Sequence, residues 1–268
     1  MGYQLGFIGA GKLAGSVIRG LMRAKFCAPG EIIASEPNEQ TRSALQKETG
    51  VSVTEDNAEA VRNATTIFIG VKPGMVAGIL RDLSPQLDNK PVVSLAGGVR
   101  IASMEKVANA RFMRALTNTP SAICRGATGI ARGARTTNED VDRAKQIFGA
   151  LGVVVEIDES RIDIITALSG SGPAFVYTII DALAQSGVKL GLAKDICDEL
   201  AIQTVLGAAE LMRESKMSAE ELVRMVVTPG GTTAAGLAVM EKMKTTESLV
   251  AAVEAAAKRG QEMADENS

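Results

Sequence analysis

Short apolar runs alternate with helix-like stretches along the first half of the chain. The runs are rich in branched residues, as buried strands are, and the stretches between them repeat apolar residues at helical spacing. The expected strands are YQLGFIG, EIIASE, TTIFIGV, PVVSLAG, RFMRALT and VVVEID, and the expected helices cover about 12–26, 38–49, 74–84 and 138–150. This alternation predicts an N-terminal Rossmann-type doubly wound parallel sheet with helices on both faces.

The pattern changes after Asp158, where long helices rich in Ala, Gly, Leu and Ile replace the alternation. These helices are expected over about 161–186, 193–214, 218–227 and 245–265. We therefore predict an α/β chain with a Rossmann-type domain over 1–158 and an all-helical domain over 159–268.

One of the expected helices, DELAIQTVLGAAELM, is apolar around most of its circumference, so it should be covered on several sides. The expected cover is a second subunit, which would give a helical homodimer, and the alternative is a tightly packed monomeric bundle. In another helix, Gly170, Gly172 and Pro173 of LSGSGPAFVY are expected to produce a kink or a close approach to a second backbone.

The overall composition indicates a globular protein without a strongly charged surface. Of its 268 residues 46% are hydrophobic, and 29 Lys and Arg residues balance 31 Asp and Glu residues. This balance provides no basic surface for nucleic acid or anionic lipid. We find no signal-peptide pattern before Gly9, no apolar run that approaches the roughly 20 residues of a membrane helix, and three widely spaced Cys residues. These features favour the cytoplasm, with no nucleic-acid or membrane partner.

The chain contains no histidine. Catalytic schemes that pair Ser or Cys with His, zinc sites with His ligands, and His-assisted proton transfer are therefore excluded. The chemistry must use Lys, carboxylates, hydroxyls or backbone groups, and no metal site is predicted.

The segment GFIGAGKLAGSV places Gly9, Gly11 and Ala14 after an expected strand and at the start of an expected helix. In a dinucleotide-binding turn the first glycine allows a tight turn, the second lets the backbone approach a pyrophosphate, and the small third residue lets helix and strand pack closely. The pyrophosphate would then lie against the helix N-terminus. Glycine-rich turns also serve as plain connections, but the flanking strand and helix and a second strand about 20 residues later favour dinucleotide binding.

The end of the second expected strand should contact the adenosine ribose of the cofactor. A carboxylate there accepts a hydrogen bond from the 2′-hydroxyl of NAD, whereas a small hydroxyl residue with a nearby cation admits the 2′-phosphate of NADP. The expected position is Ser35, with Asn38 and Arg42 as candidate phosphate partners. This favours NADPH, with NADH as the alternative, because a shift of one residue would place Glu36 there. Arg42 is equally well explained as a solvated helix residue.

Four further loops at the carboxyl ends of the expected strands are candidates for the rest of the cofactor site. They contain Asn57, then Val71, Lys72 and Pro73, then Ala96 and Gly97, and finally Asn118 and Thr119. Each loop alone is explained by ordinary turn chemistry. Together they supply the backbone and amide groups that the nicotinamide-ribose end of a dinucleotide requires.

The segments FIGAGKLA, VKP, TNTP, LSGSGPA and TPGGTTAAGL follow one another along the whole chain. In this set and order the chain resembles the pyrroline-5-carboxylate reductases, and TPGGTTAAGL is the most specific segment because many dehydrogenases share the first. The resemblance implies NAD(P)H-dependent reduction of 1-pyrroline-5-carboxylate to L-proline in the cytoplasm. It also implies a helical dimerisation domain, an active site between subunits, and dimers assembled into a larger homo-oligomer.

The resemblance further implies roles for individual residues. Thr233, as the catalytic residue, would bond the ring nitrogen of the substrate, and the backbone around Gly230, Gly231 and Thr232 would hold the substrate carboxylate. Glu159 matches an acidic position near the substrate, and a solvated surface carboxylate explains it equally well. The implied cofactor positions are Gly9, Ala10, Gly11, Lys12, Leu13, Ser35, Asn57, Val71, Lys72, Pro73, Ala96 and Gly97.

Imine reduction agrees with the lack of histidine. Reduction of a ketone leaves an alkoxide that needs a proton, whereas a protonated cyclic imine needs only a hydride at carbon. Two alternatives stand beside this interpretation. A 3-hydroxy-acid dehydrogenase would need a Lys that LSGSGPAFVYTII lacks at the required spacing, and a dinucleotide-binding redox sensor would need a recognition element that the helices do not show.

Overall fold

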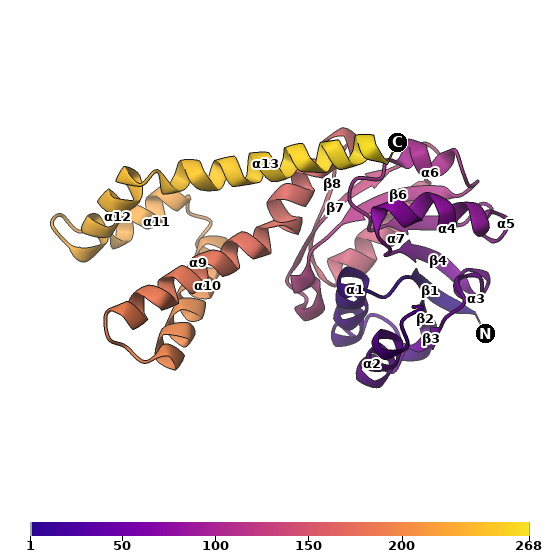
Figure 1. Ribbon diagram of the computed structural model, residues 1–268, viewed down its shortest axis with the longest axis horizontal. Helices are drawn as coiled ribbons and strands as arrows, with labels where there is room; N and C mark the ends of the chain where they lie inside the picture. The colour runs from indigo at the N-terminus through magenta and orange to yellow at the C-terminus, as the bar shows by residue number, and fades with distance from the viewer. Residues whose placement is uncertain (1, 268) are drawn as a thin grey trace. The chain divides into compact units, whose positions relative to one another are not determined.

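The computed structural model describes residues 2–267 and contains an eight-stranded sheet. Its strands are β1 Tyr3–Ile8, β2 Ile32–Ser35, β3 Ser52–Thr54, β4 Ala64–Ile69, β5 Pro91–Ser94, β6 Arg111–Leu116, β7 Gly126–Arg132 and β8 Gly152–Glu156. They lie in the order β3-β2-β1-β4-β5-β6-β7-β8 (Figure 1). The first six follow the Rossmann order, in which the chain reverses direction of winding between β1 and β4.

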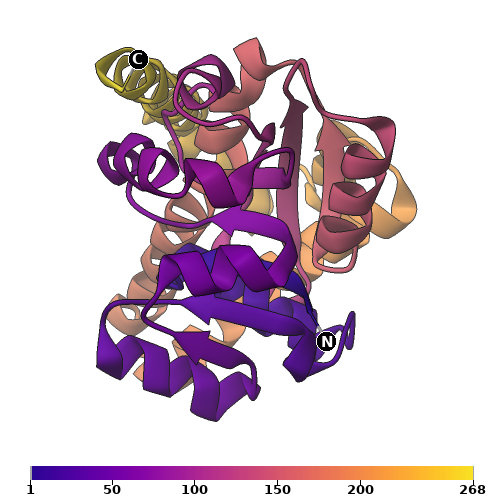
Figure 2. The same ribbon diagram turned by 90° about the vertical axis from the view of Figure 1, so that its right-hand side faces the viewer.

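Helices connect these strands and lie around the sheet (Figure 2). Between the strands lie α1 Lys12–Arg23, α2 Glu39–Thr49, α3 Asn57–Asn63, α4 Val76–Asp82, α5 Ser84–Leu87, α6 Ile101–Glu105 and α7 Asn138–Gly149, with the short turns η1 Pro29–Glu31, η2 Pro73–Met75 and η3 Thr119–Ile123. After β8 follow η4 Glu159–Arg161, α8 Ile162–Ile165 and η5 Thr166–Gly170.

Two hydrophobic cores lie on opposite faces of the sheet, because successive side chains of a strand point to opposite sides. Phe7 and Phe68 belong to the core beneath α1, α2 and α7, and their rings stack at 4.6 Å between centroids. Ile8 and Ile67 belong to the core beneath α3, α4, α5 and α6. This arrangement confirms the predicted α/β fold with helices on both faces.

Two strands were not expected from the sequence. β3 has only three residues, and β7 reads GATGIAR, without the run of branched residues that marked the other strands. β7 pairs antiparallel with β6, whereas the other strand pairs are parallel. Gly129 of β7 is explained by packing, because a Cβ there would lie 2.9 Å from the side chain of Ile165.

Packing divides the chain into two compact units. The first runs to Ser171 and resumes at Ala255, and the second spans Gly172–Glu254. The remaining helices are α9 Gly172–Lys189, α10 Lys194–Ser215, α11 Ala219–Val226, α12 Thr232–Lys242 and α13 Thr245–Glu266. The all-helical character of the second half is therefore confirmed. The boundary predicted between residues 158 and 159 followed a change in composition, and as a division into domains it stays a prediction.

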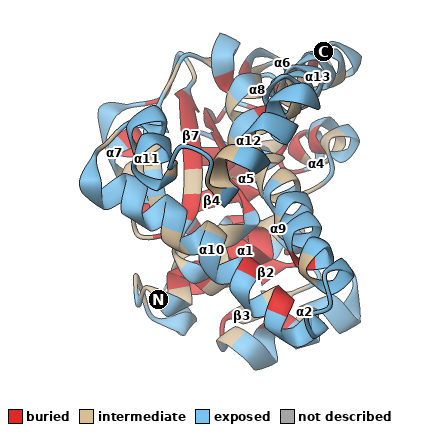
Figure 3. Ribbon diagram, turned by 90° about the vertical axis from the view of Figure 1, so that its left-hand side faces the viewer, coloured by how far each residue is buried: buried red, intermediate tan, exposed pale blue. Residues whose placement is uncertain are grey.

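The helices of the second unit expose many large apolar side chains, and Figure 3 shows α10, α11 and α12 mostly in the colour of exposed residues. On α10 only Cys197 and Ala201 are buried, against α9. Leu200 is 57% exposed and Leu211 is 53% exposed. Within a single chain this helix lacks the cover that its apolar circumference predicts.

Near Gly170–Pro173, where a kink or a close backbone approach is expected, the helix contains a π-helical turn, η5, in which the Ser171 N–H donates to the Thr166 carbonyl at 2.8 Å. The helical stretch Glu159–Lys189 therefore continues through the glycines, and by length and composition alone it is apolar enough to cross a membrane. This corrects the expectation that no apolar run reaches that length. A single such helix is weak evidence for a membrane span, because helices that pack in soluble proteins share this composition.

Candidate functional site

Gly9 forms the turn between β1 and α1. Its φ is +81°, a conformation that residues with a Cβ rarely adopt, and its N–H donates to the carbonyl of Ser35 at 2.9 Å. A Cβ at this position would also lie 2.7 Å from the side chain of Val71. Glycine is therefore required here by both conformation and space, as in the tight turn of a dinucleotide-binding motif.

Gly11 and Ala14 meet the other two requirements of that motif. Gly11 caps the N-terminus of α1 without a side chain, and a Cβ there would meet no atom of the described residues within 4 Å. Open space therefore adjoins the first N–H groups of the helix. Ala14 is fully buried, and a Cβ at Gly70 would lie only 2.6 Å from the Ala14 Cβ. Small residues at both positions let α1 pack closely against the end of β4.

A cavity of about 270 Å³ lies at the carboxyl ends of β1, β2 and β4, next to the point where the winding reverses. In doubly wound sheets this is where ligands bind. The predicted residues that line it are Gly9, Gly11, Asn57, Val71 and Lys72, together with Glu36, the alternative to Ser35. The residues that sequence reasoning did not include are Pro37, Gly70, Met75 and Ile79. The structure therefore brings together predicted cofactor residues from three separate loops.

Ser35 ends β2 and is fully buried. Its hydroxyl lies 2.5 Å from the Asn57 side-chain oxygen and 3.3 Å from the Phe7 carbonyl, and both are acceptors. Ser35 is not among the residues that line the cavity, whereas Asn57 is. In this structure Ser35 therefore acts on the cavity through the position of the Asn57 amide.

Glu36 is the first residue after β2, and its side chain lines the cavity. Its carboxylate accepts hydrogen bonds from the N–H of Ala10 and the N–H of Asn38, each at 3.1 Å. The sequence left Ser35 and Glu36 as alternatives at this position. The structure places the Glu36 carboxylate, rather than the Ser35 hydroxyl, at the cavity, because all four residues of β2 are buried.

The other predicted cofactor positions lie at the same carboxyl edge of the sheet and outside the cavity lining. They are Ala10, Lys12 and Leu13 at the start of α1, Pro73 at the start of η2, and Ala96 and Gly97 after β5. Their contact with a cofactor stays a prediction. Asn118 has a structural explanation, because its amide donates to the Ser169 carbonyl at 3.0 Å and accepts from the Ala127 N–H at 3.1 Å.

The TPGGTT segment forms a turn that leads into α12. The Gly231 N–H donates to the Thr228 carbonyl at 2.9 Å, Pro229 takes the second position of the turn, and Gly230 takes the third with a φ of +72°. A glycine with positive φ after a proline is the pattern of a type II turn. Gly231 then caps the helix without a side chain. The N-terminus of α12 is therefore open to a ligand in the second unit.

Thr233 lies in the first turn of α12 and is half-buried. Threonines deeper in helices return their hydroxyl to the carbonyl four residues earlier, as Thr204 does to Leu200 at 2.7 Å. That carbonyl belongs to Pro229 for Thr233, outside the helix, and none of the described residues forms a hydrogen bond with the Thr233 hydroxyl. The hydroxyl therefore retains its full capacity to bond a ligand.

Glu159 lies in η4 and is held by two partners. One carboxylate oxygen accepts from the Ile101 N–H at 2.7 Å and from Arg114 at 3.2 Å. Arg114 is 1% exposed and also pairs with Asp163 at 3.5 Å. Glu159 therefore balances a buried charge within the first unit, and its predicted contact with substrate stays a prediction.

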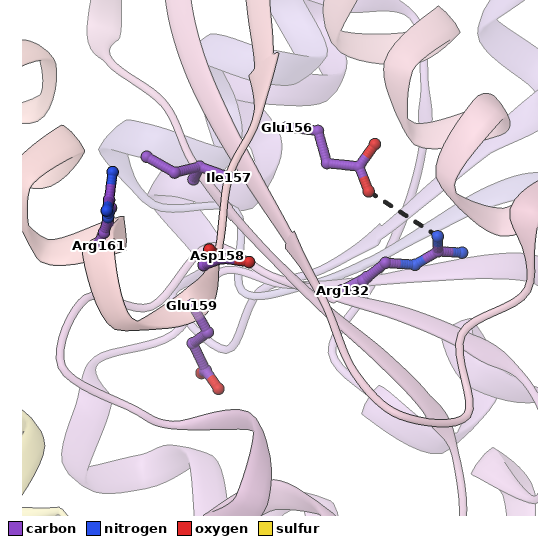
Figure 4. A pocket seen from close by; sticks show the side chains of 6 residues that line it. All are labelled: Arg132, Glu156, Ile157, Asp158, Glu159 and Arg161. Carbon is purple, nitrogen blue, oxygen red and sulfur yellow. Dashed lines mark ion pairs between the residues drawn. The ribbon is translucent and has the colours of Figure 1, made fainter.

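A cavity of about 360 Å³ beside Glu159 is lined by Arg132, Glu156, Ile157, Asp158, Glu159 and Arg161 (Figure 4). Glu156 pairs with Arg132 at 3.9 Å and with Lys145 at 2.6 Å, and the Glu159 carboxylate points away from the Glu156–Arg132 pair. This cavity contains none of the predicted cofactor residues. Among the described residues, no group of three or more His, Cys, Asp and Glu residues could hold a metal ion.

Comparison with protein families divides the chain into two matches. A family model described as pyrroline-5-carboxylate reductase dimerisation matches residues 159–263. A second model, described as NADP oxidoreductase, coenzyme F420-dependent, matches residues 4–98. The second match covers β1, Gly9, Gly11 and the cavity described above.

Individual relatives match nearly the whole chain. A pyrroline-5-carboxylate reductase of Synechocystis is 40% identical over 98% of this chain and 99% of the relative, and one of Pisum sativum is 39% identical over 97% and 96%. The crystal structure of Plasmodium falciparum pyrroline carboxylate reductase with NADP bound is 30% identical and superposes with a TM-score of 0.90 over 98% of both chains. On this fold, this identity and this coverage, the chain belongs to the pyrroline-5-carboxylate reductase family.

Proposed function

We propose that this chain reduces 1-pyrroline-5-carboxylate to L-proline with a hydride from NAD(P)H, the last step of proline biosynthesis. The observation that carries the proposal is the Pro229–Gly231 turn, which leads into the N-terminus of α12 beside the unengaged hydroxyl of Thr233. The helix N-terminus suits the carboxylate of the substrate, and the hydroxyl suits its ring nitrogen. Membership of the family supports the same reaction.

The cofactor site in this proposal is the cavity of the first unit. NAD(P)H supplies the hydride when bound, and the N–H groups at the start of α1, over Gly11–Leu13, hold its pyrophosphate. The open space beside Gly11 fits this role, because any side chain there would occupy the approach to the helix end. Asn57, Val71 and Lys72 line the same cavity and contact the remainder of the cofactor. Pro73, Ala96 and Gly97 extend the site along the sheet edge.

The substrate carboxylate binds at the turn before α12 in this proposal. Of the three backbone positions implied there, the Gly231 N–H already serves the turn through Thr228. Gly230 and Thr232 therefore supply the remaining N–H groups, and the positive end of the α12 dipole adds to their attraction for a carboxylate. Glu159 is proposed as an acidic residue of the substrate site.

The reaction needs no acid from the protein once the imine is protonated. The hydride adds to the C=N carbon, the π-electron pair moves to nitrogen, and the iminium charge is neutralised as the amine forms. Thr233 Oγ accepts a hydrogen bond from the N–H of the iminium and thereby fixes the orientation of the ring. The chain contributes position and exclusion of water rather than proton transfer, in agreement with its lack of histidine.

The purified protein tests this proposal directly. With NADH or NADPH and 1-pyrroline-5-carboxylate we expect oxidation of the nicotinamide and formation of L-proline, identified by chiral chromatography. With 3-oxo acids of similar size we expect no oxidation above the background rate. Oxidation with a 3-oxo acid in place of the imine would contradict the proposal and favour a hydroxy-acid dehydrogenase.

We further propose that the chain forms a homodimer through its helical half, that dimers assemble into a larger homo-oligomer, and that the protein acts in the cytoplasm. The exposed apolar side chains of α10 and the match of residues 159–263 to a dimerisation model support the dimer. The same match supports the division into a cofactor-binding domain over 1–158 and a dimerisation and substrate domain over 159–268. Light scattering should give a mass of at least twice the 27.9 kDa of one chain.

A further inference from the structure

We propose that Glu36 sets the cofactor preference of this chain and favours NADH over NADPH. The inference rests on the proposed dinucleotide site and deepens it. The adenosine ribose of the cofactor lies against the Glu36 carboxylate, which accepts hydrogen bonds from the ribose hydroxyls and repels a 2′-phosphate. A matching family model and a related structure carry NADP in their names. The preference for NADH proposed here departs from those names and is argued from this chain's own residues.

The Glu36 carboxylate is held in place with acceptor capacity to spare. One oxygen accepts from the Ala10 N–H in the glycine-rich turn, and the other accepts from the Asn38 N–H. A carboxylate offers about four lone-pair positions, so each oxygen keeps one for a ribose hydroxyl. Two ribose hydroxyls can therefore bind without displacing either backbone donor.

The position of Glu36 in the fold is the one from which ribose is recognised. It follows the strand next to β1, and it lines the same cavity as Gly9 and Gly11. In Rossmann folds an acidic residue about 20 residues beyond the glycine-rich turn accepts from the 2′-hydroxyl of NAD. Glu36 meets this description in sequence and in space.

Ser35 and Asn38, two candidate partners for a 2′-phosphate, do not line the cavity. The Ser35 hydroxyl is buried and bonded to Asn57 or Phe7. The Asn38 side chain accepts from the Thr41 N–H at 2.9 Å and caps α2. The Ser35 hydroxyl cannot reach the cavity without breaking a contact of the fold, and the Asn38 amide is held at the start of α2, outside the cavity lining.

Arg42, the candidate cation, is engaged in the same way. Its guanidinium donates to the Glu36 carbonyl at 2.7 Å and to the Pro37 carbonyl at 3.3 Å, and it lies 3.6 Å from the Glu55 carboxylate. Its side chain is 18% exposed, so little of its charge faces solvent. A 2′-phosphate would meet the Glu36 carboxylate without a compensating cation, and such like-charge contacts discriminate strongly against a ligand.

Lys72 is the cation that lines the cavity. It belongs to the loop after β4 rather than to the segment that follows β2. The pyrophosphate is common to NADH and NADPH, so a contact of Lys72 with it would strengthen both cofactors alike. Lys72→Gln should therefore weaken the binding of both cofactors without changing the ratio of their dissociation constants. This separates the effect of Lys72 from that of Glu36.

Direct binding tests the proposal without the imine. Titration of the full-length protein with NADH and NADPH, followed by nicotinamide fluorescence, should give at least roughly tenfold tighter binding of NADH, since hydrogen bonds to a charged group contribute this much or more. Glu36→Ser should shift the ratio of the two dissociation constants toward NADPH by about tenfold or more. Glu36→Gln, which retains the shape and one acceptor oxygen, should shift the ratio in the same direction by less.

Glu39→Gln is the matched control, because Glu39 carries the same charge, is exposed in the first turn of α2 and lies outside the cavity lining. The ratio of the NADH and NADPH dissociation constants of this variant should equal that of the wild type. Tighter binding of NADPH by the wild type, or equal effects of Glu36→Ser on both cofactors, would overturn the inference. Reduction of the imine with NADPH as the better donor would overturn the preference alone, whereas NADH-selective binding without imine reduction would contradict only the proposed function.

Discussion

Arg111 and Asp140 form a two-point ion pair that joins strand β6 to helix α7. The Arg111 guanidinium donates to the two carboxylate oxygens at 2.7 and 2.9 Å, and the Thr137 N–H donates to one of them at 3.0 Å. The Asp140 side chain is 7% exposed. Burial acts to raise the pKa of Asp140, but the hydrogen bonds from Arg111 and Thr137 outweigh it, and the pKa lies below its ordinary value.

Asp140→Asn should lower the free energy of unfolding near neutral pH by about 2–3 kcal/mol, because a largely buried carboxylate with charged hydrogen bonds is lost. The pKa of an Asp carboxyl in the unfolded chain is roughly 3.9. A carboxyl group whose pKa is lower in the folded protein stabilises the fold at pH values above about 3.9, and this stabilisation is lost as the pH falls through the pKa of the folded state. The difference between wild type and variant should therefore shrink in acid. Urea unfolding at a series of pH values measures it.

Asp142→Asn provides the control for that series. Asp142 is an exposed residue of the same helix, and the described residues offer it no ion pair. We expect a difference from the wild type within about 0.5 kcal/mol, as for other exposed positions. A constant deficit of Asp140→Asn at every pH would mean that packing, rather than charge, explains the loss.

Gly20 of α1 lies against the backbone of η3. A Cβ there would be 2.1 Å from the Ser121 carbonyl oxygen and 2.8 Å from the Leu151 side chain. Gly20→Ala must therefore separate α1 from η3, and we expect a loss of about 1–3 kcal/mol or more in unfolding free energy. Chemical denaturation measures this loss.

Gly78→Ala makes the same change in α4 and isolates the steric effect. A Cβ at Gly78 would meet no atom of the described residues within 4 Å. Since alanine is a better helix former than glycine by up to about 1 kcal/mol, this variant should be at least as stable as the wild type. Similar losses at Gly20 and Gly78 would show that contact with η3 is not the cause.

The regular alternation of strands and helices made the first half of the fold predictable, but the two departures have physical reasons. β7 contains glycines in place of the run of branched residues from which the other strands were predicted. Those glycines are needed for packing against Ile165 and the η3 turn. The π-helical turn at Thr166–Gly170 keeps a helix continuous through residues that normally interrupt one. Both features depend on neighbours that a local pattern does not contain.

The candidate site was predictable where one residue type fits one backbone position. Gly9 takes the positive φ that the tight turn of the predicted dinucleotide-binding motif requires. The choice between Ser35 and Glu36 depended instead on where β2 ends, which composition does not determine to a single residue. The contacts of Glu159 with Arg114 and Ile101 join segments far apart in sequence, so no local signal marked them.

Ser35→Ala should separate the role of the Ser35 hydroxyl from that of the Glu36 carboxylate. The hydroxyl holds the Asn57 side chain at the cavity. Loss of the hydroxyl should therefore weaken the binding of NADH and of NADPH by the same factor, about two- to tenfold for one neutral hydrogen bond. Cofactor titration of the variant measures both constants. A selective loss of NADPH affinity would mean that Ser35 contacts the 2′-phosphate directly.

Thr233→Val replaces the hydroxyl proposed to orient the imine with a methyl group of similar size. Because the hydroxyl forms no hydrogen bond within the described part of the chain, its removal should leave unfolding free energy nearly unchanged. The catalytic efficiency kcat/KM for 1-pyrroline-5-carboxylate should fall by about ten- to a hundredfold, as for loss of a hydrogen bond to a charged group. Steady-state rates at saturating cofactor measure this change.

Thr49→Val is the matched control for Thr233→Val, because the Thr49 hydroxyl returns to the Leu45 carbonyl within α2 at 2.6 Å and lies outside every proposed binding contact. It should retain the wild-type kcat/KM. Cofactor affinity should be unchanged in both variants, since Thr233 is proposed to touch the substrate alone. If Thr233→Val kept full activity, orientation of the ring would have to come from the N-terminus of α12 through the carboxylate, and the hydroxyl would have no part in the reaction.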